Sequence, residues 1–222
     1  MPFYRKVGSV PRKRHIAHRH EPGYRGEGIY YEEVVSTGGF DHAYSICYHL
    51  RPPTRVKKVE PAGEVSVDIA QEPVLRHHHF KTAQLKPHGD PILGRVPLLV
   101  NADVAISRCV PAQRQTELYR NAVADEVLFV HQGKGILHTP FGQLPFKPCD
   151  YVVIPRCTTY RLEFEAAMQP NLLVIEASES ITIPPHYRNR MVRSNSVHRI
   201  TNGTSMDQKS CKPSTGRTRR RY

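Results

Sequence analysis

The sequence lacks the features that would point to a membrane protein. No apolar run in its 222 residues approaches the roughly 18 residues that a membrane-spanning helix requires. No apolar stretch of the kind found in secretory signal peptides follows Met1. We therefore expect a protein that works in the cytoplasm and has no membrane partner.

Cysteine is scarce and scattered along the chain. The five cysteines are Cys47, Cys109, Cys149, Cys157 and Cys211, and no two of them form a Cys-x-x-Cys pair. A zinc site or a thiol redox motif is therefore not expected, and the thiols of a cytosolic protein are ordinarily reduced. The sequence also has no Gly-x-Ser-x-Gly motif, no phosphate-binding P-loop and no glycine motif for dinucleotides.

The net charge of +12 is unevenly distributed. Residues 191–222 hold eight basic residues against Asp207 alone, a net charge of +7, whereas the other 190 residues carry 24 basic and 19 acidic side chains. The body of the protein is thus only mildly basic. A nucleic-acid partner is not indicated by the body, and the excess charge belongs to the tail.

Proline and glycine are abundant, with 19 and 14 residues. Frequent turns between short elements favour an all-β protein. Strands are predicted where apolar residues cluster or alternate with polar ones, at 44–48, 65–69, 73–80, 97–101 and 103–110. No internal repeat is found, and strands do not alternate with helices, so a TIM barrel or a dinucleotide-binding fold is not expected.

The strongest pattern lies between residues 125 and 176. Strands are predicted at 126–131, 136–139, 151–155 and 171–176, with turns at 132–135 and 141–144. Glycines in these turns can adopt positive φ. Short strands separated by turns at this spacing are typical of a β-sandwich or a jelly roll.

Several short sequences in one order carry a family resemblance. They are Pro11-Arg12-Lys13-Arg14-His15, Tyr48-His49 before Pro52-Pro53-Thr54, the run from Asn121 to Gly135, Phe141-Gly142-x-Leu144, the run from Asp150 to Arg156, and Pro185-His186-Tyr187-Arg188-Asn189. The central runs resemble the hairpin core of a cupin. Together the sequences resemble the N-terminal half of the homogentisate 1,2-dioxygenase family, over roughly residues 4–190.

The resemblance implies a chemistry, a cofactor and partners for the full-length protein. The reaction is opening of the homogentisate ring by O₂ at a non-haem Fe(II), giving maleylacetoacetate in tyrosine and phenylalanine catabolism. Two histidines and one carboxylate hold such an iron and leave positions open for both reactants. In this family the ligands lie in the C-terminal half, beyond the part that this chain resembles, and the full-length proteins are homo-oligomers.

The residues of this chain do not reproduce a cupin metal site. Such a site needs His-x-His and a downstream Glu on the hairpin, and this hairpin offers only His131 and His138. His77 and His79 would share one face of a strand and could both reach a metal, but a solvated histidine run is the alternative. His15, His18 and His20 lie in an arm without a scaffold. We therefore predict no catalytic residue, no metal ligand and no iron on this chain, and we leave its substrate-binding residues unassigned.

Two cysteines depart from the family pattern. Cys149 and Cys157 stand where the resemblance leads us to expect glycine, in turns that follow Pro148 and Arg156. If these turns require positive φ, a Cβ costs on the order of 1–2 kcal/mol at each position. A disulfide between the two cysteines is an alternative that a cytosolic location disfavours.

The resemblance ends after Asn189. The family continues with Tyr-Gly-Gln, whereas this chain continues with Met191-Val192-Arg193. Codons TAT-GGT-CAG read one base late begin ATG-GTC-AG, so we hypothesise a one-base frameshift near Arg190. Residues 191–222 hold too few apolar side chains to form a core, and we expect a disordered basic tail there. A genuine tail that binds RNA or an acidic partner is the alternative.

These observations predict an irregular arm over residues 1–28, an all-β, cupin-like jelly roll or β-sandwich over 29–190, and the tail over 191–222. The predicted function is that of the non-catalytic half of a homogentisate dioxygenase, inactive as a truncated chain alone. Two alternatives stay open: a cupin that binds a ligand or partner without chemistry, and a nucleic-acid binder that acts through its tail.

Overall fold

The computed structural model describes residues 30–36, 44–49, 51–61, 67, 69–70 and 76–182. The predicted arm at 1–28, the predicted tail at 191–222 and most of the predicted strand at 65–69 lie outside these residues. Within them, no helix is long and apolar enough to cross a membrane.

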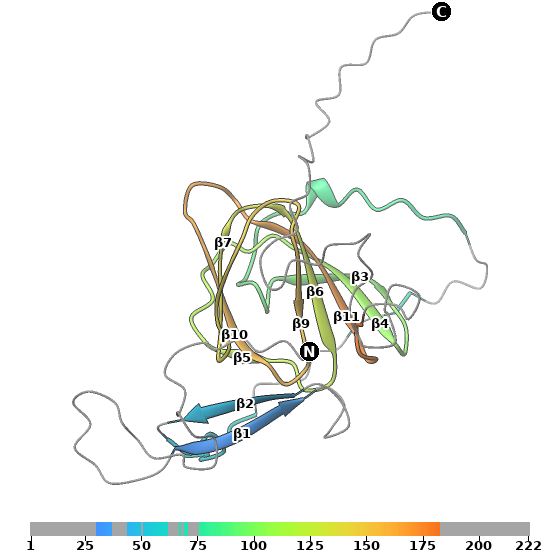
Figure 1. Ribbon diagram of the computed structural model, residues 1–222. Helices are drawn as coiled ribbons and strands as arrows, with labels where there is room; N and C mark the ends of the chain where they lie inside the picture. Colours follow the sequence, from blue (N-terminus) through green and yellow to red (C-terminus); the bar gives the residue numbers. More distant parts are fainter. Residues whose placement is uncertain are drawn as a thin grey trace, which may run out of the picture.

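Nearly all regular structure in the described residues is β (Figure 1). One sheet has five strands in the order β3-β4-β11-β6-β9, and a second sheet has four in the order β5-β10-β7-β8. Their bounds are β3 Arg95–Val100, β4 Val104–Cys109, β5 Tyr119–Arg120, β6 Asp125–Gln132, β7 Gly135–Thr139, β8 Gly142–Phe146, β9 Tyr151–Ile154, β10 Thr159–Phe164 and β11 Asn171–Ala177. A separate hairpin joins β1 Tyr31–Ser36 to β2 Tyr44–His49, and one 3₁₀ turn, η2, spans Thr82–Gln84.

The chain crosses between the two sheets at almost every step. From β4 onward it alternates sheets through β5, β6 and β7, and after the β7–β8 hairpin it crosses again to β9, β10 and β11. All pairings between these strands are antiparallel. Alternation of this kind produces the double-sheet jelly roll, so the predicted all-β, cupin-like sandwich is confirmed.

Most predicted strands are present, and three predictions need correction. Residues 76–80 of the strand predicted at 73–80 form an exposed irregular segment, because a run of His77, His78 and His79 supplies no apolar face to bury. The turn predicted at 141–144 is shorter: Thr139 pairs with Gly142, so only two residues turn, and β8 begins at Gly142 with φ 114°. Strand β10 at Thr159–Phe164 was not predicted, since polar residues alternate with its apolar ones.

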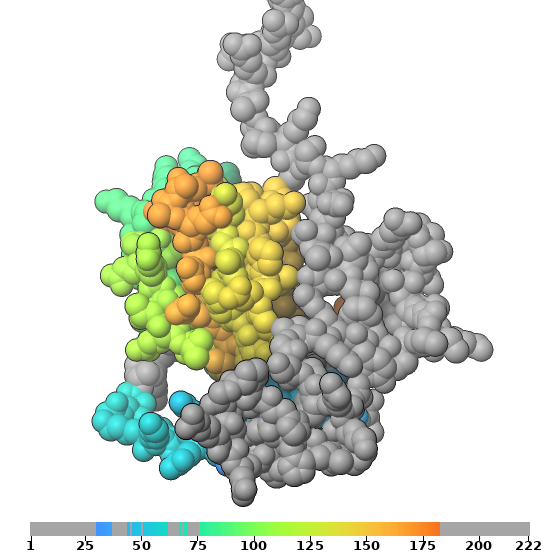
Figure 2. Space-filling view, turned by 60° about the vertical axis from the view of Figure 1, so that its left-hand side comes forward, coloured from blue at the N-terminus to red at the C-terminus, as the bar shows by residue number. Residues whose placement is uncertain are grey.

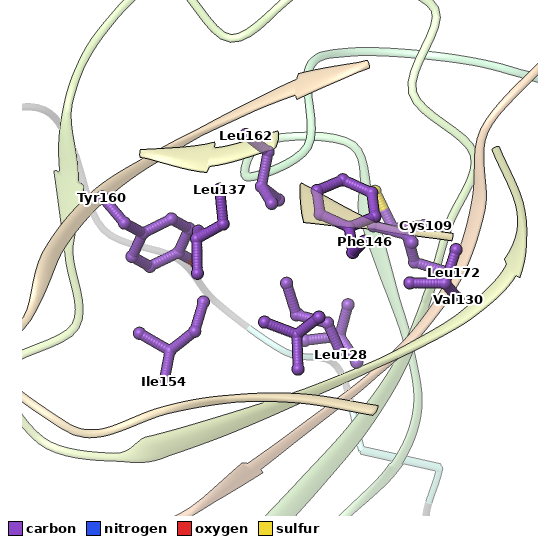
Figure 3. Close-up of a cluster of buried hydrophobic side chains, with 11 residues drawn as sticks. Cys109, Leu128, Val130, Leu137, Phe146, Ile154, Tyr160, Leu162 and Leu172 are labelled. Carbon is purple, nitrogen blue, oxygen red and sulfur yellow. The ribbon is translucent and has the colours of Figure 1, made fainter. Parts of the chain in front are cut away.

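The core lies between the two sheets (Figure 3). Period-two alternation turns Leu128 and Val130 of β6 inward, where they meet Leu137 of β7, Tyr160 of β10 and Phe146 of β8. Figure 3 shows Ile154 and Leu128 pointing from the five-stranded sheet toward Tyr160 and Leu137 on the other side. The cluster comprises Cys109, Leu128, Val130, Leu137, Phe146, Val152, Ile154, Tyr160, Leu162, Leu172 and Val174.

Candidate functional site

The two histidines predicted to lie on one hairpin do not meet, because β6 and β7 belong to different sheets and the hairpin predicted between them is wrong. His131 follows Val130, which points inward, so His131 lies on the outside of the five-stranded sheet, edge-on to Phe129 with ring centroids 4.6 Å apart. Burial, and after it the charge of Arg108, lowers the pKa of His131. His138 lies on the outside of the other sheet, where its Nε2 is 2.9 Å from Glu163 Oε2. The whole sandwich therefore separates these two imidazoles.

The other histidine candidates are not brought together either. His77, His78 and His79 are exposed and belong to no strand, and the His78 ring stacks on Phe80 at 6.0 Å. The shared strand face that would have let His77 and His79 hold one metal is therefore absent. His15, His18 and His20 lie outside the described residues.

Apolar side chains fill the interior of the sandwich, where the resemblance to a cupin would place metal ligands. Inward positions of β6, β7 and β8 are occupied by Leu128, Val130, Leu137 and Phe146, none of them more than 4% exposed. In the part of the chain that the structure describes, no three His, Cys, Asp or Glu side chains are placed to hold a metal ion. The residues present in this sandwich do not fit an iron.

One end of the interior is polar instead of apolar. Arg95 of β3 lies beside two carboxylates, with its Nη1 2.5 Å from Glu126 Oε1 and 3.2 Å from Glu176 Oε1. The Tyr160 hydroxyl accepts a hydrogen bond from Arg95 Nη2 at 2.9 Å and donates one to Glu126 Oε2 at 2.7 Å. Asn121 Nδ2 donates to Glu176 Oε1 at 2.9 Å. One guanidinium thus joins residues from both sheets.

Burial sets the electrostatics of this group, which we call the Arg95 network: Arg95, Asn121, Glu126, Tyr160 and Glu176. Burial alone would lower the pKa of Arg95, but Tyr160, Glu126 and Glu176 together raise it, so the guanidinium stays charged. Burial and then Glu126 raise the pKa of Tyr160. Burial also raises the pKa of Glu176, against an opposing effect of Arg95. Arg95 therefore stays charged and Tyr160 stays protonated, so their hydrogen bonds can link the two sheets.

Sequence reasoning missed this network, although one feature could have revealed it. Glu126 shares the inward face of β6 with Leu128 and Val130, and a carboxylate at an inward strand position needs a buried cation. The partner could not have been named, because Arg95 stands 31 residues away along the chain.

The two cysteines at expected glycine positions have the expected backbone. Cys149 has φ 72° and Cys157 has φ 62°, and no other described residue except glycine has positive φ. The Cys149 N–H donates to Val130 O and the Cys157 N–H to Asn121 O, each at 2.7 Å. Asn121 O lies before the start of β6 and Val130 O near its end, so the two cysteines bind to opposite ends of this strand. The five residue steps from Asp125 to Val130 alone span about 16 Å. A disulfide needs Cα atoms within about 7 Å, and these two cysteines form no disulfide with each other.

A surface hollow of about 380 Å³ lies at the open side of β10. Its walls are the segment 111–115, residues 161–164 of β10 and the loop 165–170. Gln169 Nε2 donates to Pro111 O at 2.6 Å and so joins the two loops. Arg114 and Arg161 line the hollow together with Glu163 and Glu165. Figure 2 shows this side, where the green segment before β5 and the orange loop after β10 lie next to one another.

Comparisons with known proteins give one sequence relative of interest. No protein-family model matches the chain. A protein of Saccharolobus solfataricus named "Putative dioxygenase SSO1533" is 36% identical over 191 residues, which are 85% of this chain and 47% of that protein. The chain therefore spans about half the length of this relative, and most of its sequence is related to a protein that bears a dioxygenase name.

Several solved structures match up to about half of this chain. A structure of Ralstonia eutropha described as a "putative mannose-6-phosphate isomerase" matches with a TM-score of 0.40 and 18% identity, over 47% of this chain and all of that one. A cupin-2 domain protein of Shewanella frigidimarina matches at 0.37 and 14%, over 44% and 88%. A cupin protein of Bacteroides fragilis matches at 0.36 and 14%, over 50% and 93%. The cupin-like fold itself follows from the strand order described above.

Proposed function

We propose that this chain is the metal-free cupin half of an iron-dependent dioxygenase of the homogentisate type, and that it opens no aromatic ring by itself. Its relation to the Saccharolobus protein supports a dioxygenase, and the short sequences between Pro11 and Asn189 support the homogentisate class. In such a protein, homogentisate, O₂ and Fe(II) would all bind to the other half.

One observation carries the proposal that this half has no chemistry of its own. His131 and His138 lie on opposite outer faces of the sandwich, while Leu128, Val130, Leu137 and Phe146 fill the space between the sheets. A non-haem iron oxygenase needs two histidines and a carboxylate on one face of the metal, with open positions for its reactants. No described group of side chains meets that need, so we derive no step through iron on this chain.

The role left for the chain is to hold and support the catalytic half. A sandwich closed by an apolar core and linked by the Arg95 network is a rigid body on which another domain can rest. The predicted location in the cytoplasm and the predicted homo-oligomer belong to the whole protein and stay predictions.

The purified chain provides the test. We would incubate it with Fe(II), ascorbate and homogentisate in air, and follow O₂ uptake and the formation of maleylacetoacetate. The expected result is no ring cleavage above a protein-free control. The full-length Saccharolobus protein in the same assay is the positive comparison, and its activity would support the homogentisate class. Ring cleavage by this chain alone would overturn the proposal.

The hollow beside β10 favours a second candidate, a binding module without chemistry. Arg114 and Arg161 could hold the carboxylate of a small aromatic acid next to Phe164 and Met168. Homogentisate would then raise the melting temperature of the chain without consuming O₂, and Arg114→Ala would remove most of that rise. No thermal shift at millimolar homogentisate would dismiss this candidate.

A further inference from the structure

The outer faces of the two sheets differ in character. Outward positions of the four-stranded sheet are mostly polar or charged, such as Arg161, Glu163, His138 and Gln143. Antiparallel sheets commonly bury one face and expose a polar one, and this sheet follows that rule. The five-stranded sheet does not, because most of its outward positions are apolar.

Register defines the apolar surface, which we call the outer apolar face. One row crosses all five strands through Val96, Arg108, Leu173, Phe129 and Tyr151. The next row crosses them through Leu99, Ile106, Ile175, Val127 and Val153. Tyr151 is 58% exposed, Leu99 53% and Val153 47%. Nine of these ten side chains are uncharged, so the face is unsuited to water.

The size of the face is that of a binding site. Strands about 4.8 Å apart and rows about 7 Å apart give a patch on the order of 300 Å². Apolar patches of this size on monomers often mark interaction sites. The patch is smaller than the about 800 Å² that each partner buries in a stable interface. A partner would therefore cover the face and extend over its rim.

Arg108 is the one charged member of the outer apolar face, and none of the described carboxylates pairs with it. Its side chain is almost fully buried, with 7% exposure, and its Nε has no hydrogen-bond partner. In the described part of the chain, no carboxylate lies within ion-pair distance of it. Burial lowers the pKa of Arg108, which reflects the cost of this unpaired charge. A buried guanidinium of this kind calls for an anion.

Charge decides among the candidate occupants of the face. The ten side chains of the two rows include no carboxylate, so a second copy docked through the same face would bring none to Arg108. Residues 1–29 hold seven basic and two acidic side chains, and residues 183–222 hold ten and one. Like charge therefore disfavours both ends of this chain. The partner must bring an acid of its own.

We propose that the outer apolar face binds a second protein domain, which covers the two rows and places one Asp or Glu carboxylate on Arg108. We assign that domain to the half of the longer protein that this chain does not span, an assignment that rests on the proposed function. The carboxylate would satisfy the buried guanidinium, and the apolar rows would supply most of the buried area.

The test co-expresses this chain with the part of the Saccharolobus relative outside the match, as two separate polypeptides. We expect both to elute together as a one-to-one complex. Amide hydrogen exchange should show protection on β4, β6 and β11, and not on β7 or β10. Arg108→Glu and Leu99→Asp should each weaken the complex at least tenfold. Arg161→Glu, on the polar outer face of the other sheet, should leave it unchanged.

Two variants keep the test decisive. Leu99 is half exposed, so Leu99→Asp should fold even if Arg108→Glu does not. The absence of a complex, a complex that both variants leave intact, or protection only on the four-stranded sheet would overturn the inference. A dimer of this chain alone that Leu99→Asp dissociates would also overturn it, in favour of a second copy.

The chain's own acidic segment is the remaining occupant. Residues 62–75 carry Glu64, Asp68 and Glu72 and no basic residue. Replacing these three acids by their amides tests this alternative. If the replacement lowers the stability of the isolated chain, and has no such effect in a chain that also carries Arg108→Met, then this segment supplies the anion for Arg108 and the inference is wrong. The ring-cleavage assay stays independent: an inactive chain that forms no complex overturns this inference and leaves the proposed function standing.

Discussion

The Tyr160 hydroxyl on β10 donates a hydrogen bond to Glu126 on β6 at 2.7 Å, and this bond ties the four-stranded sheet to the five-stranded one. Both side chains are fully buried, with 0% and 1% exposure. The same hydroxyl accepts a hydrogen bond from Arg95. The link therefore also holds the Arg95 guanidinium between the sheets, and its contribution to stability can be measured.

Tyr160→Phe should destabilise the chain by about 2 kcal/mol, because Glu126 Oε2 would stay buried without its donor. Urea unfolding of the chain and the variant measures the difference. Tyr151→Phe is the matched control, since Tyr151 is 58% exposed and its change should stay within about 0.5 kcal/mol. Equal effects of the two substitutions would mean that the inter-sheet link contributes nothing.

Cys157→Gly should stabilise the chain by about 1 kcal/mol, since glycine adopts φ 62° without the Cβ strain of cysteine. The backbone N–H keeps its bond to Asn121 O, and the exposed thiol makes only a weak contact of 3.9 Å with Ala122 O. Cys157→Ala retains the Cβ and serves as the control, with no comparable gain. A loss of stability in the glycine variant would contradict the strain argument.

Stability should respond to pH through Glu176. Burial raises the pKa of Glu176 above its ordinary 4.5, with Arg95 opposing the shift. Because the pKa of Glu176 is higher in the folded state than in the unfolded state, this group stabilises the fold below about pH 4.5. That stabilisation is lost as the pH rises through the folded-state pKa. Glu176→Gln should therefore gain stability relative to the unchanged chain between pH 4 and pH 7.

Denaturation midpoints of the unchanged chain and of the Glu176→Gln variant, each measured at pH 4 and pH 7, test this prediction. Subtracting one protein's pH dependence from the other's removes the effect of every other titrating group, because both proteins contain those groups. Glu179→Gln, at an exposed position after β11, reports the general effect of losing one carboxylate. A relative loss of stability by Glu176→Gln as the pH rises would show that Arg95 outweighs burial.

Arg108→Met should raise the stability of the isolated chain by about 1 kcal/mol or more, because a buried unpaired charge is replaced by an apolar side chain of similar length. Thermal and urea unfolding measure the gain. Arg161→Met is the control, as Arg161 lies 3.7 Å from Glu163 on a polar face and should change little. A clear loss at Arg108 would mean that its guanidinium is already satisfied in the isolated chain.

Local pattern was enough to predict much of the fold. Strands β4, β6, β7, β9 and β11 lie within a residue or two of their predicted positions, because each alternates inward apolar residues between turn residues. Strand β10 was missed, since Arg161 and Glu163 hide its inward Tyr160 and Leu162. The strand predicted around His77–His79 was wrong, because three histidines resemble a strand in spacing and yet offer nothing to bury.

By itself, the sequence determined the all-β class, the positions of most strands and the lack of a His-x-His pair. These depend on residue type and short-range spacing, which are local. Only the tertiary structure decided that His131 and His138 point to opposite sides and that Arg95 meets Glu126 and Tyr160. It also decided that Arg108 lies on an apolar face, where its buried Nε has no hydrogen-bond partner. Those relations depend on strand register and sheet order, which bring together residues 31 to 65 positions apart.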